Sequence, residues 1–340
     1  MGQNRIQYID AMRGFTMILV VYSHVCMFCF GDYYMAFNKV LFLLRLPCFF
    51  FISGWLFYKV GRIWDTFTVR QVISHKFMVQ IVPTVIFLAL HERTHFFHQL
   101  GAFKGGYWFT FALFIYFVLF SLTAWLVKKH RMVVFLLSAF IISVAAYWYD
   151  VYYHHIAHQL GWGREVLGFL GFVTWRYYLF FILGALAKKY FDRFLVLTDR
   201  HVVQFIVVAL FCLMAVLPVT DCWSWSYTRF AVSGICGMVM VFTFFRKFAS
   251  WFTKEKPLGR GLQYVGTRTL DIYLLHFFFL PEFLMAHRDM LLSRHQLWLE
   301  IVVVLLLALI VLACCLIASY VLRLSPFLAK YLFGVTPKDK

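Results

Sequence analysis

Charged residues are scarce in this sequence. Asp, Glu, Lys and Arg make up 14% of its 340 positions, against 63% hydrophobic residues, and the mean hydropathy is +0.78. In soluble globular domains roughly a quarter of the residues are charged. The shortage therefore excludes a soluble protein and predicts an integral membrane protein.

Other familiar signals are missing as well. We find no internal repeat and no low-complexity tract, and the first apolar segment is too long, and lacks the small-residue site, for a cleavable signal peptide. The eight cysteines are scattered, and neither Cys26 with Cys29 nor Cys314 with Cys315 belongs to a disulfide or metal-binding framework. We expect the cysteines to be small apolar packing residues and the first apolar segment to be a membrane span.

Long apolar runs are what the sequence has in abundance. About 20 mostly apolar residues cross a bilayer as one helix. Ten segments are candidates for such spans, roughly at residues 14–30, 41–58, 77–90, 107–127, 132–149, 170–187, 202–219, 229–245, 270–286 and 301–322. The prediction is an all-α, polytopic membrane protein with about ten transmembrane helices, forming a single domain over residues 1–340 with a helical core at about 5–335.

The basic residues test this count, because cytoplasmic loops of membrane proteins hold an excess of Lys and Arg. With the N-terminus inside, the segments expected in the cytoplasm hold 23 of the 32 Lys and Arg residues. This bias predicts an even number of spans and both termini in the cytoplasm. It also explains the net charge of +17 by topology and contact with anionic membrane lipids, so we expect no nucleic-acid partner.

The first span carries an arginine and a histidine at the two ends of one apolar stretch, RGFTMILVVYSH at residues 13–24. Eleven residues make close to three helical turns, so Arg13 and His24 share one face and are separated by roughly 16 Å along the axis. Arg13 is then expected at the level of the cytoplasmic headgroups, and His24 near the middle of the hydrocarbon layer.

An ionisable side chain in the middle of a membrane is costly and generally faces the bundle interior or a water-filled cavity. Burial keeps a histidine neutral and able to accept a proton, which is what a general base requires. Two simpler interpretations stay open. His24 can be a hydrogen-bonded packing residue, and Arg13 can be an anchor whose charged end reaches the interface.

The ninth apolar segment holds a second membrane histidine, His276, with Asp271 nearer the cytoplasmic end and Pro281 interrupting the helix. Two histidines at membrane depth favour a catalytic or conducting pathway over packing. Arg45 and Arg176 also lie within spans, toward the outer ends. They are candidates for an acceptor entrance, with simple anchoring at the interface as the alternative.

Five motifs, taken together, point to one family. They are Asp10-Ala-Met-Arg13-Gly14 followed after ten further residues by His24, then PCFFFISG at residues 47–54, GGYWF at 105–109, FFILG at 180–184 and GTRTLDIYLLH at 266–276. In this order, and over nearly the whole chain, the sequence resembles the acyltransferase 3 family of multi-spanning membrane O-acyltransferases.

The resemblance implies transfer of an acyl group, commonly acetyl from acetyl-CoA, to a hydroxyl of a carbohydrate, with the donor approaching from the cytoplasm. Arg13 and His24 match the signature pair of the family. The resemblance also suggests a glycan of the bacterial envelope or surface as acceptor, and the bacterial cytoplasmic (inner) membrane as location.

One departure from the family pattern concerns donor binding. Family members often carry Arg-x-x-Arg just before a proline at the start of the third helix, but here Phe77 and Gln80 precede Pro83. Arg70 and Lys76 are therefore assigned to the donor by charge alone.

The residues and the resemblance combine into one hypothesis for the mechanism. Arg13, helped by Arg62, Arg70 and Lys76, holds the CoA phosphates. His24 takes the proton from the acceptor hydroxyl, and His276 orients His24 or shares the proton. We see no Gly-x-Ser-x-Gly motif that would favour a covalent acyl-enzyme, and no resident metal is predicted. The candidates for the substrate pathway are Asp10, Arg45, Trp108, Arg176, Asp271 and Tyr273.

A zinc protease is one competing class. The segment His91-Glu92-Arg-Thr-His95 matches the H-E-x-x-H signature, but it falls where the third span turns polar, and no segment for a third ligand is evident. His98 and the group His154, His155 and His158 lie on the same predicted outer side. Three interpretations are open for these histidines: metal capture, a place at the membrane interface among aromatic residues, and part of a sugar-binding mouth.

A transporter or flippase for a lipid-linked glycan is the second competing class. It would also have about ten spans, buried charges and a kinked ninth helix. Transporters often show inverted repeats with paired broken helices, and we see neither in the sequence. This class stays the alternative to the acyltransferase.

Overall fold

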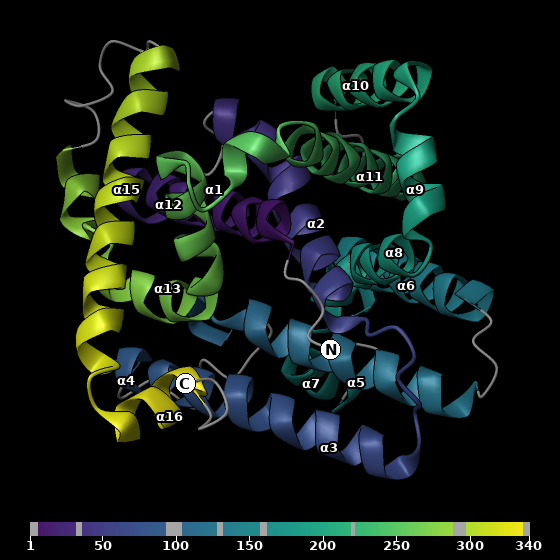
Figure 1. Ribbon diagram of the computed structural model, residues 1–340, viewed down its shortest axis with the longest axis horizontal. Helices are drawn as coiled ribbons and strands as arrows, with labels where there is room; N and C mark the ends of the chain where they lie inside the picture. The colour runs from purple at the N-terminus through teal and green to yellow at the C-terminus, as the bar shows by residue number, and fades with distance from the viewer. Residues whose placement is uncertain are drawn as a thin grey trace. The chain divides into compact units, whose positions relative to one another are not determined.

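The computed structural model describes residues 6–31, 36–92, 104–127, 132–156, 162–218, 222–287 and 297–335. All regular structure within these ranges is helical (Figure 1). The prediction of an all-α protein is confirmed for the part of the chain that the structure describes.

Seven helices among the described residues are long and apolar enough to cross a membrane. They are α1 (Gln7–Phe30), α2 (Ala36–Phe57), the continuous helix of α3 (Thr66–Lys76) and α4 (Val82–Glu92), α5 (Trp108–Leu126), α6 (Met132–Ile156), α11 (Trp223–Lys247) and α15 (Leu297–Leu322).

Two bent pairs of helices raise the number of apolar spans to as many as nine. One joins α7 (Trp162–Phe169) to α8 (Tyr178–Lys189) through a 3₁₀ turn at Phe172–Tyr177, and the other joins α9 (Phe191–Thr198) to α10 (His201–Val216). The pairs are bent by 49° and 77°, respectively. The chain thus has the helices of a multi-pass membrane protein, whereas the count of ten and the cytoplasmic termini stay predictions.

The ninth predicted span differs from expectation. Its α-helix, α13 (Thr269–Leu275), ends at Leu275 and tightens into a 3₁₀ turn at His276–Phe279, and a second 3₁₀ segment follows at Glu282–His287. Leu280 is extended, with φ −68° and ψ 123°, because a residue that precedes proline is disfavoured in the α conformation. The prediction of one helix interrupted only at Pro281 is corrected accordingly.

Proline also disturbs the helix of α3 and α4. Pro83 has no N–H and does not close the bond to the carbonyl four residues earlier. Directly before it, residues Phe77–Ile81 form a π-helical turn, in which the N–H of Val82 bonds to the carbonyl of Phe77. A π turn inside a long helix commonly lies at a functional site.

By packing, the chain divides into two compact units. The first unit comprises residues 1–49, 197–217 and 232–324, and the second comprises residues 50–196, 218–231 and 325–340. The single domain over residues 1–340 stays a prediction.

In the first unit, α1 lies beside α12 (Pro257–Thr267) and α15, and α13 packs on α15 (Figure 1). The crossing of α1 and α12 depends on two glycines. A Cβ atom on Gly14 would overlap the carbonyl oxygen of Leu262, and one on Gly266 would overlap the carbonyl oxygen of Asp10. The two helices therefore touch through their main chains, as small residues allow in membrane proteins.

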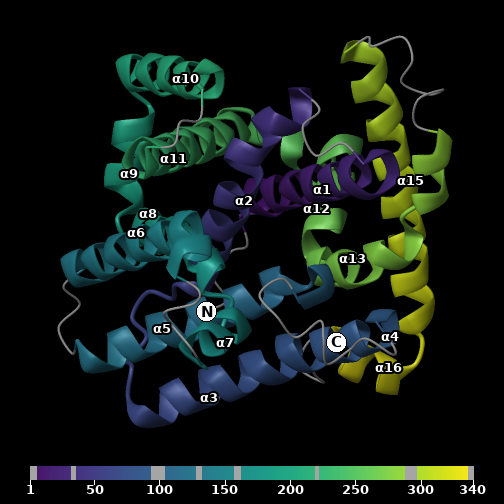
Figure 2. The same ribbon diagram turned by 180° about the vertical axis from the view of Figure 1, so that it is seen from behind.

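In the second unit, α3 runs along α5, and α16 (Pro326–Phe333) packs against α4 (Figure 2). A Cβ atom on Gly54 would overlap the carbonyl oxygen of Phe181, and one on Gly184 would overlap that of Phe51. All four of these glycines belong to the motifs described above, so part of the motif pattern serves helix crossing.

Candidate active site

Arg13 and His24 lie on α1, in the first unit, and both side chains are half-buried. The helix begins at Gln7 and ends before Gly31, whose left-handed φ of 61° lets its N–H bond to the carbonyl of Cys26. Both residues are thus on one uninterrupted helix, as predicted, and neither is fully enclosed by protein.

His24 is in direct contact with His276. Nδ1 of His24 is 2.6 Å from Nε2 of His276, a hydrogen-bonding distance. The two rings are nearly parallel, at 12°, with centroids 4.7 Å apart. Since the nitrogen atoms are much closer than the centroids, the imidazoles meet edge to edge. The structure therefore brings together the two histidines that the sequence proposed as catalytic.

The main chain determines which nitrogen atoms carry protons. Nδ1 of His276 lies 2.7 Å from the carbonyl oxygen of Tyr273 and 3.2 Å from that of Ile272. A carbonyl only accepts, so Nδ1 of His276 donates and the Nε2 of a neutral His276 accepts. His24 must then donate from Nδ1, which leaves its Nε2 with a free lone pair. This is the arrangement of a general base oriented by a second group.

Phenylalanine rings line the histidine pair. The ring centroid of Phe277 lies 5.3 Å from that of His24 and 4.0 Å from that of His276. Phe28, one turn after His24 on α1, meets the His24 ring nearly at right angles, with 6.0 Å between centroids. His276 itself has no exposed surface. The contact between the imidazoles thus lies in a largely apolar surround, where a hydrogen bond is stronger than in water.

Asp271 anchors the helix that carries Tyr273 and His276. Arg323 donates to it from Nε and Nη2, at 2.7 Å and 2.8 Å, and Ser319 donates at 2.5 Å. The carboxylate is 2% exposed. Ser319 joins α13 to α15, and the bidentate pair joins α13 to the residue directly after α15. The structure therefore places Asp271, a predicted substrate-pathway residue, as an anchor of the histidine helix.

Asp10 and Arg45 also lie in the first unit. Asp10 is buried and lines a cavity of about 360 Å³, together with Lys254, Arg260, Gln263, Tyr264 and Thr267. Arg45 is 4% exposed, and its guanidinium lies over the ring of Phe42.

The remaining predicted pathway residues, Trp108 and Arg176, belong to the second unit. The Trp108 ring is half-buried and lies nearly parallel to Tyr177, with centroids 6.1 Å apart. Nη1 of Arg176 is 2.5 Å from Oδ2 of Asp150, and its guanidinium also faces the rings of Tyr147, Tyr177 and Phe230. Asp150, the partner that balances this membrane arginine, was not predicted from the sequence.

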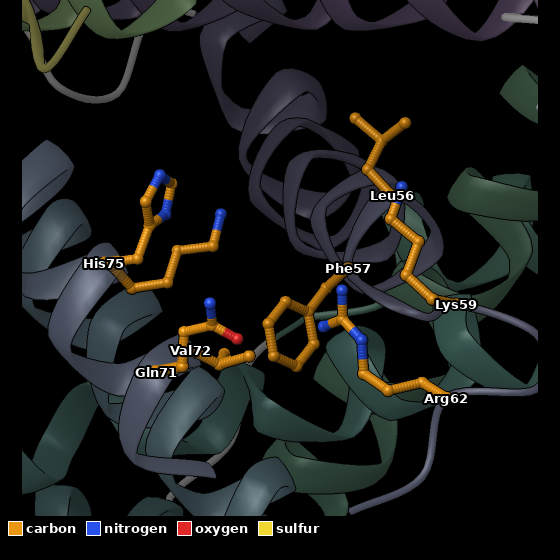
Figure 3. A pocket seen from close by; sticks show the side chains of 8 residues that line it. Leu56, Phe57, Lys59, Arg62, Gln71, Val72 and His75 are labelled. Carbon is orange, nitrogen blue, oxygen red and sulfur yellow. The ribbon is translucent and has the colours of Figure 1, made fainter. Parts of the chain in front are cut away.

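A basic cavity of about 380 Å³ lies in the second unit, between the end of α2 and α3. Figure 3 shows Phe57 between Lys59 and Arg62 on one side and the side chains of α3 on the other. None of the residues that line it in the described chain is acidic; they are Leu56, Phe57, Lys59, Arg62, Gln71, Val72, His75 and Lys76.

This cavity is lined by two of the three residues of the second unit that were proposed to bind the donor, Arg62 and Lys76. Lys76 lines it, with Nζ 4.5 Å from the centroid of Phe117, whereas Arg70 is exposed and not among the lining residues. Lys59, Gln71 and His75 were missed. The only signal for Lys59 was its place in a basic cytoplasmic loop, which topology alone explains.

A second cavity, of about 540 Å³, shares Arg62 with the first. Two indole rings, those of Trp64 and Trp125, and the carboxylate of Asp65 line it. The two cavities therefore offer positive charge in one part and flat aromatic surface in the other.

The zinc signature is only partly described. His91 and Glu92 lie at the end of α4, where Nδ1 of His91 is 3.1 Å from Oε1 of Glu92. His95, His98 and His158 lie outside the described residues, as do the side chains of His154 and His155. Among the described residues, no group of three His, Cys, Asp or Glu side chains is placed to hold a metal ion.

Comparison with known proteins adds one finding. The model of a family described as an acyltransferase domain, acyltransferase 3, matches residues 6–320, nearly the whole chain. Neither the curated proteins nor the solved structures contain a match.

Proposed function

Because the chain belongs to this acyltransferase family, we propose that it is a membrane O-acyltransferase that moves an acyl group, acetyl in the first instance, from acyl-CoA to a hydroxyl of a glycan. The glycan belongs to the cell envelope or surface, and the enzyme works among the lipids of the bacterial cytoplasmic membrane. Membership in the family supports acyl transfer. The donor, the acceptor and the location are our proposal.

The observation that carries the proposal is the hydrogen-bonded series that runs from Tyr273 through His276 to His24. It ends on Nε2 of His24, a base with its lone pair free. Acyl transfer to a hydroxyl needs such a group, because a neutral alcohol is a poor nucleophile until its proton is removed. A transporter has no need of a base held in one tautomer.

The reaction then proceeds by direct transfer. The acceptor oxygen attacks the thioester carbonyl carbon as Nε2 of His24 removes the hydroxyl proton. A C–O bond forms, and the carbonyl π pair moves onto oxygen. When the carbonyl re-forms, the C–S bond breaks, and the CoA thiolate takes the proton back from His24. A well-placed base contributes about 10²- to 10⁴-fold to such a step.

The two cavities of the second unit suit a CoA nucleotide. Lys59, Arg62 and Lys76 line the basic cavity. The lysine ammonium groups and the planar arginine guanidinium would donate hydrogen bonds to the phosphate oxygens. Trp64 and Trp125 offer rings on which an adenine base can stack. Arg62 lines both cavities, so one nucleotide can use both.

Arg13 retains its proposed role near the cytoplasmic end of α1, where it binds anionic oxygens of the donor. The acceptor side is assigned to Trp108, whose half-buried ring can stack on the face of a sugar, with Arg176 and its partner Asp150 nearby in the second unit.

The test compares O-acetyl groups on surface glycan, by NMR, in cells that lack the protein and carry either the wild type or His24→Ala. We expect the acetyl signals to vanish on deletion and to return only with the wild type, at matched protein levels. Unchanged acetylation with accumulation of glycan precursors inside the cell would replace the proposal with the transporter. Full acetylation by His24→Ala would remove the base assignment.

Donor binding is tested separately with membranes and radiolabelled acetyl-CoA. Arg62→Gln should raise the KM for acetyl-CoA about tenfold, since a lost charge-assisted hydrogen bond is worth about 1.5 kcal/mol or more, and leave the maximal rate unchanged. Arg70→Gln is the matched control, because Arg70 lies outside the cavity. Equal KM values for the two variants would exclude the cavity as donor site.

A further inference from the structure

Arg45 is the buried cation of α2 in the first unit. Its side chain is 4% exposed within an apolar helix. A charged group at membrane depth is expensive and is retained where function requires it. The sequence placed Arg45 at an acceptor entrance, but the structure gives it a more specific position.

A series of polar contacts ties Arg45 to the helix of the base. Nη1 of Arg45 is 3.4 Å from Oδ1 of Asn38, and the same oxygen accepts a hydrogen bond of 2.5 Å from the hydroxyl of Ser23. Ser23 and Asn38 have no exposed surface, and Ser23 directly precedes His24 on α1. The guanidinium carbon lies 4.1 Å from the ring centroid of Phe42. The head group is therefore held in place from two sides.

This series of contacts holds the cation of Arg45 close to the turn of α1 that carries the reacting base. A fixed cation beside a base repels the proton that the base must take up, so by itself this placement would slow the reaction. The cost is offset if a negative charge develops between the two groups at the moment of proton transfer.

Acyl transfer provides such a charge, on the carbonyl oxygen of the tetrahedral intermediate. We propose that Arg45 donates a hydrogen bond from its guanidinium to this oxygen and so acts as the oxyanion-stabilising residue of the site. The inference rests on the proposed function. As the acceptor oxygen bonds to the carbonyl carbon, the π pair becomes the oxyanion beside Arg45, and His24 holds the hydroxyl proton. When the pair returns, the C–S bond breaks and the proton leaves with the thiol.

The test measures transfer of radiolabelled acetyl from acetyl-CoA to the native glycan in membranes that contain equal amounts of each variant. Arg45→Gln should lower the maximal rate about 10²- to 10³-fold, as loss of one oxyanion donor does in other acyl-transfer enzymes. The KM for acetyl-CoA should change less than threefold, because the ground-state carbonyl gains little from the interaction. Arg200→Gln, an exposed arginine at the start of α10, is the control.

Two further variants keep the test decisive if Arg45→Gln does not fold. Arg45→Lys retains the charge without the planar donor geometry and should fall between the wild type and Arg45→Gln. Adding methylguanidinium to Arg45→Ala should recover at least tenfold of the lost rate, which a purely structural role would not allow.

A maximal rate within threefold of wild type for Arg45→Gln, or a rise in KM alone, would overturn the inference and leave the proposed function standing. No transfer by the wild type, or undiminished transfer by His24→Ala, would overturn the proposed function and this inference with it.

Discussion

Arg323, directly after the end of α15, binds both carboxylate oxygens of Asp271, two residues before the Tyr273 carbonyl that accepts the proton of His276. The position of the histidine pair therefore depends on this ion pair. Helix α13 is only seven residues long, too short to be stable without such an anchor.

Removing one partner of this pair should destabilise the protein. We expect Arg323→Gln to cost about 3 kcal/mol, the lower end of the range for a broken buried pair, since Arg323 is partly exposed. Thermal unfolding in detergent measures it as a lowered Tm. Arg268→Gln is the control, because its Nη1 is 3.6 Å from Asp271 and the contact is weaker. A Tm for Arg323→Gln equal to that of the control would contradict the anchoring role.

Two substitutions of His276 should distinguish its hydrogen bond to His24 from the space that its side chain fills. Glutamine can still accept a hydrogen bond from Nδ1 of His24, whereas leucine cannot. We expect His276→Leu to lower the maximal rate of acetyl transfer about 10²-fold, the lower end of what a general base contributes, and His276→Gln to retain more of it. The KM for acetyl-CoA should stay constant in both. Equal rates for the two variants would show that the hydrogen bond to His24 is unimportant.

The crossing of α1 and α12 can be tested with two glycines of one helix. An alanine methyl at Gly266 would overlap main-chain atoms of α1, whereas nothing lies within 4 Å of the corresponding position at Gly261. We expect Gly266→Ala to destabilise by about 1–3 kcal/mol or more, and Gly261→Ala to be neutral or stabilising by about 0.4–1 kcal/mol. Tm values in detergent measure both. Equal Tm values for the two variants would contradict the close main-chain contact at Gly266.

Lys104 should make stability depend on pH. It lies between apolar spans, its Nζ donates to the Phe169 carbonyl at 2.6 Å, and it is 3% exposed. Burial lowers the pKa of Lys104 from 10.5 to about 8. Between these values the unfolded chain holds a proton that the folded chain has released, so stability rises with pH across this window. The stability gained across this window is lost again when the pH falls to about 8.

The measurement is Tm in detergent from pH 7 to 10, compared with that of Lys104→Met. The variant removes the titrating group and should show a smaller increase over this range. Parallel curves for the two proteins would mean that Lys104 is not the source of the dependence.

Most of the helices could be predicted, because a span needs about 20 apolar residues whatever it packs against. The bends were harder. The 77° bend between α9 and α10 leaves no mark in hydropathy, and the early end of α13 depends on how Leu280 responds to Pro281. Such features arise from the local backbone and from tertiary contacts, which an apolar run does not encode.

The sequence could predict several residues of the site but not the contacts between them. Arg13 and His24 follow from helical spacing, and His276 from its depth in a span. The bond between His24 and His276 joins residues 252 positions apart, and periodicity within one helix cannot reveal it. Lys59 and His75 were overlooked for another reason, since a basic loop beside a span is expected from topology alone.

The glycine contacts between α1 and α12 affect how this protein can change over time. The helix that carries His24 contacts α12 through backbone atoms at Gly14 and Gly266. Substitution of an outward-facing side chain leaves these atoms in place. Residues that meet the acceptor can therefore diverge from one descendant to the next while His24 keeps its position. A helix that rests on its neighbour's main chain at two glycines therefore leaves the side chains around it free to vary.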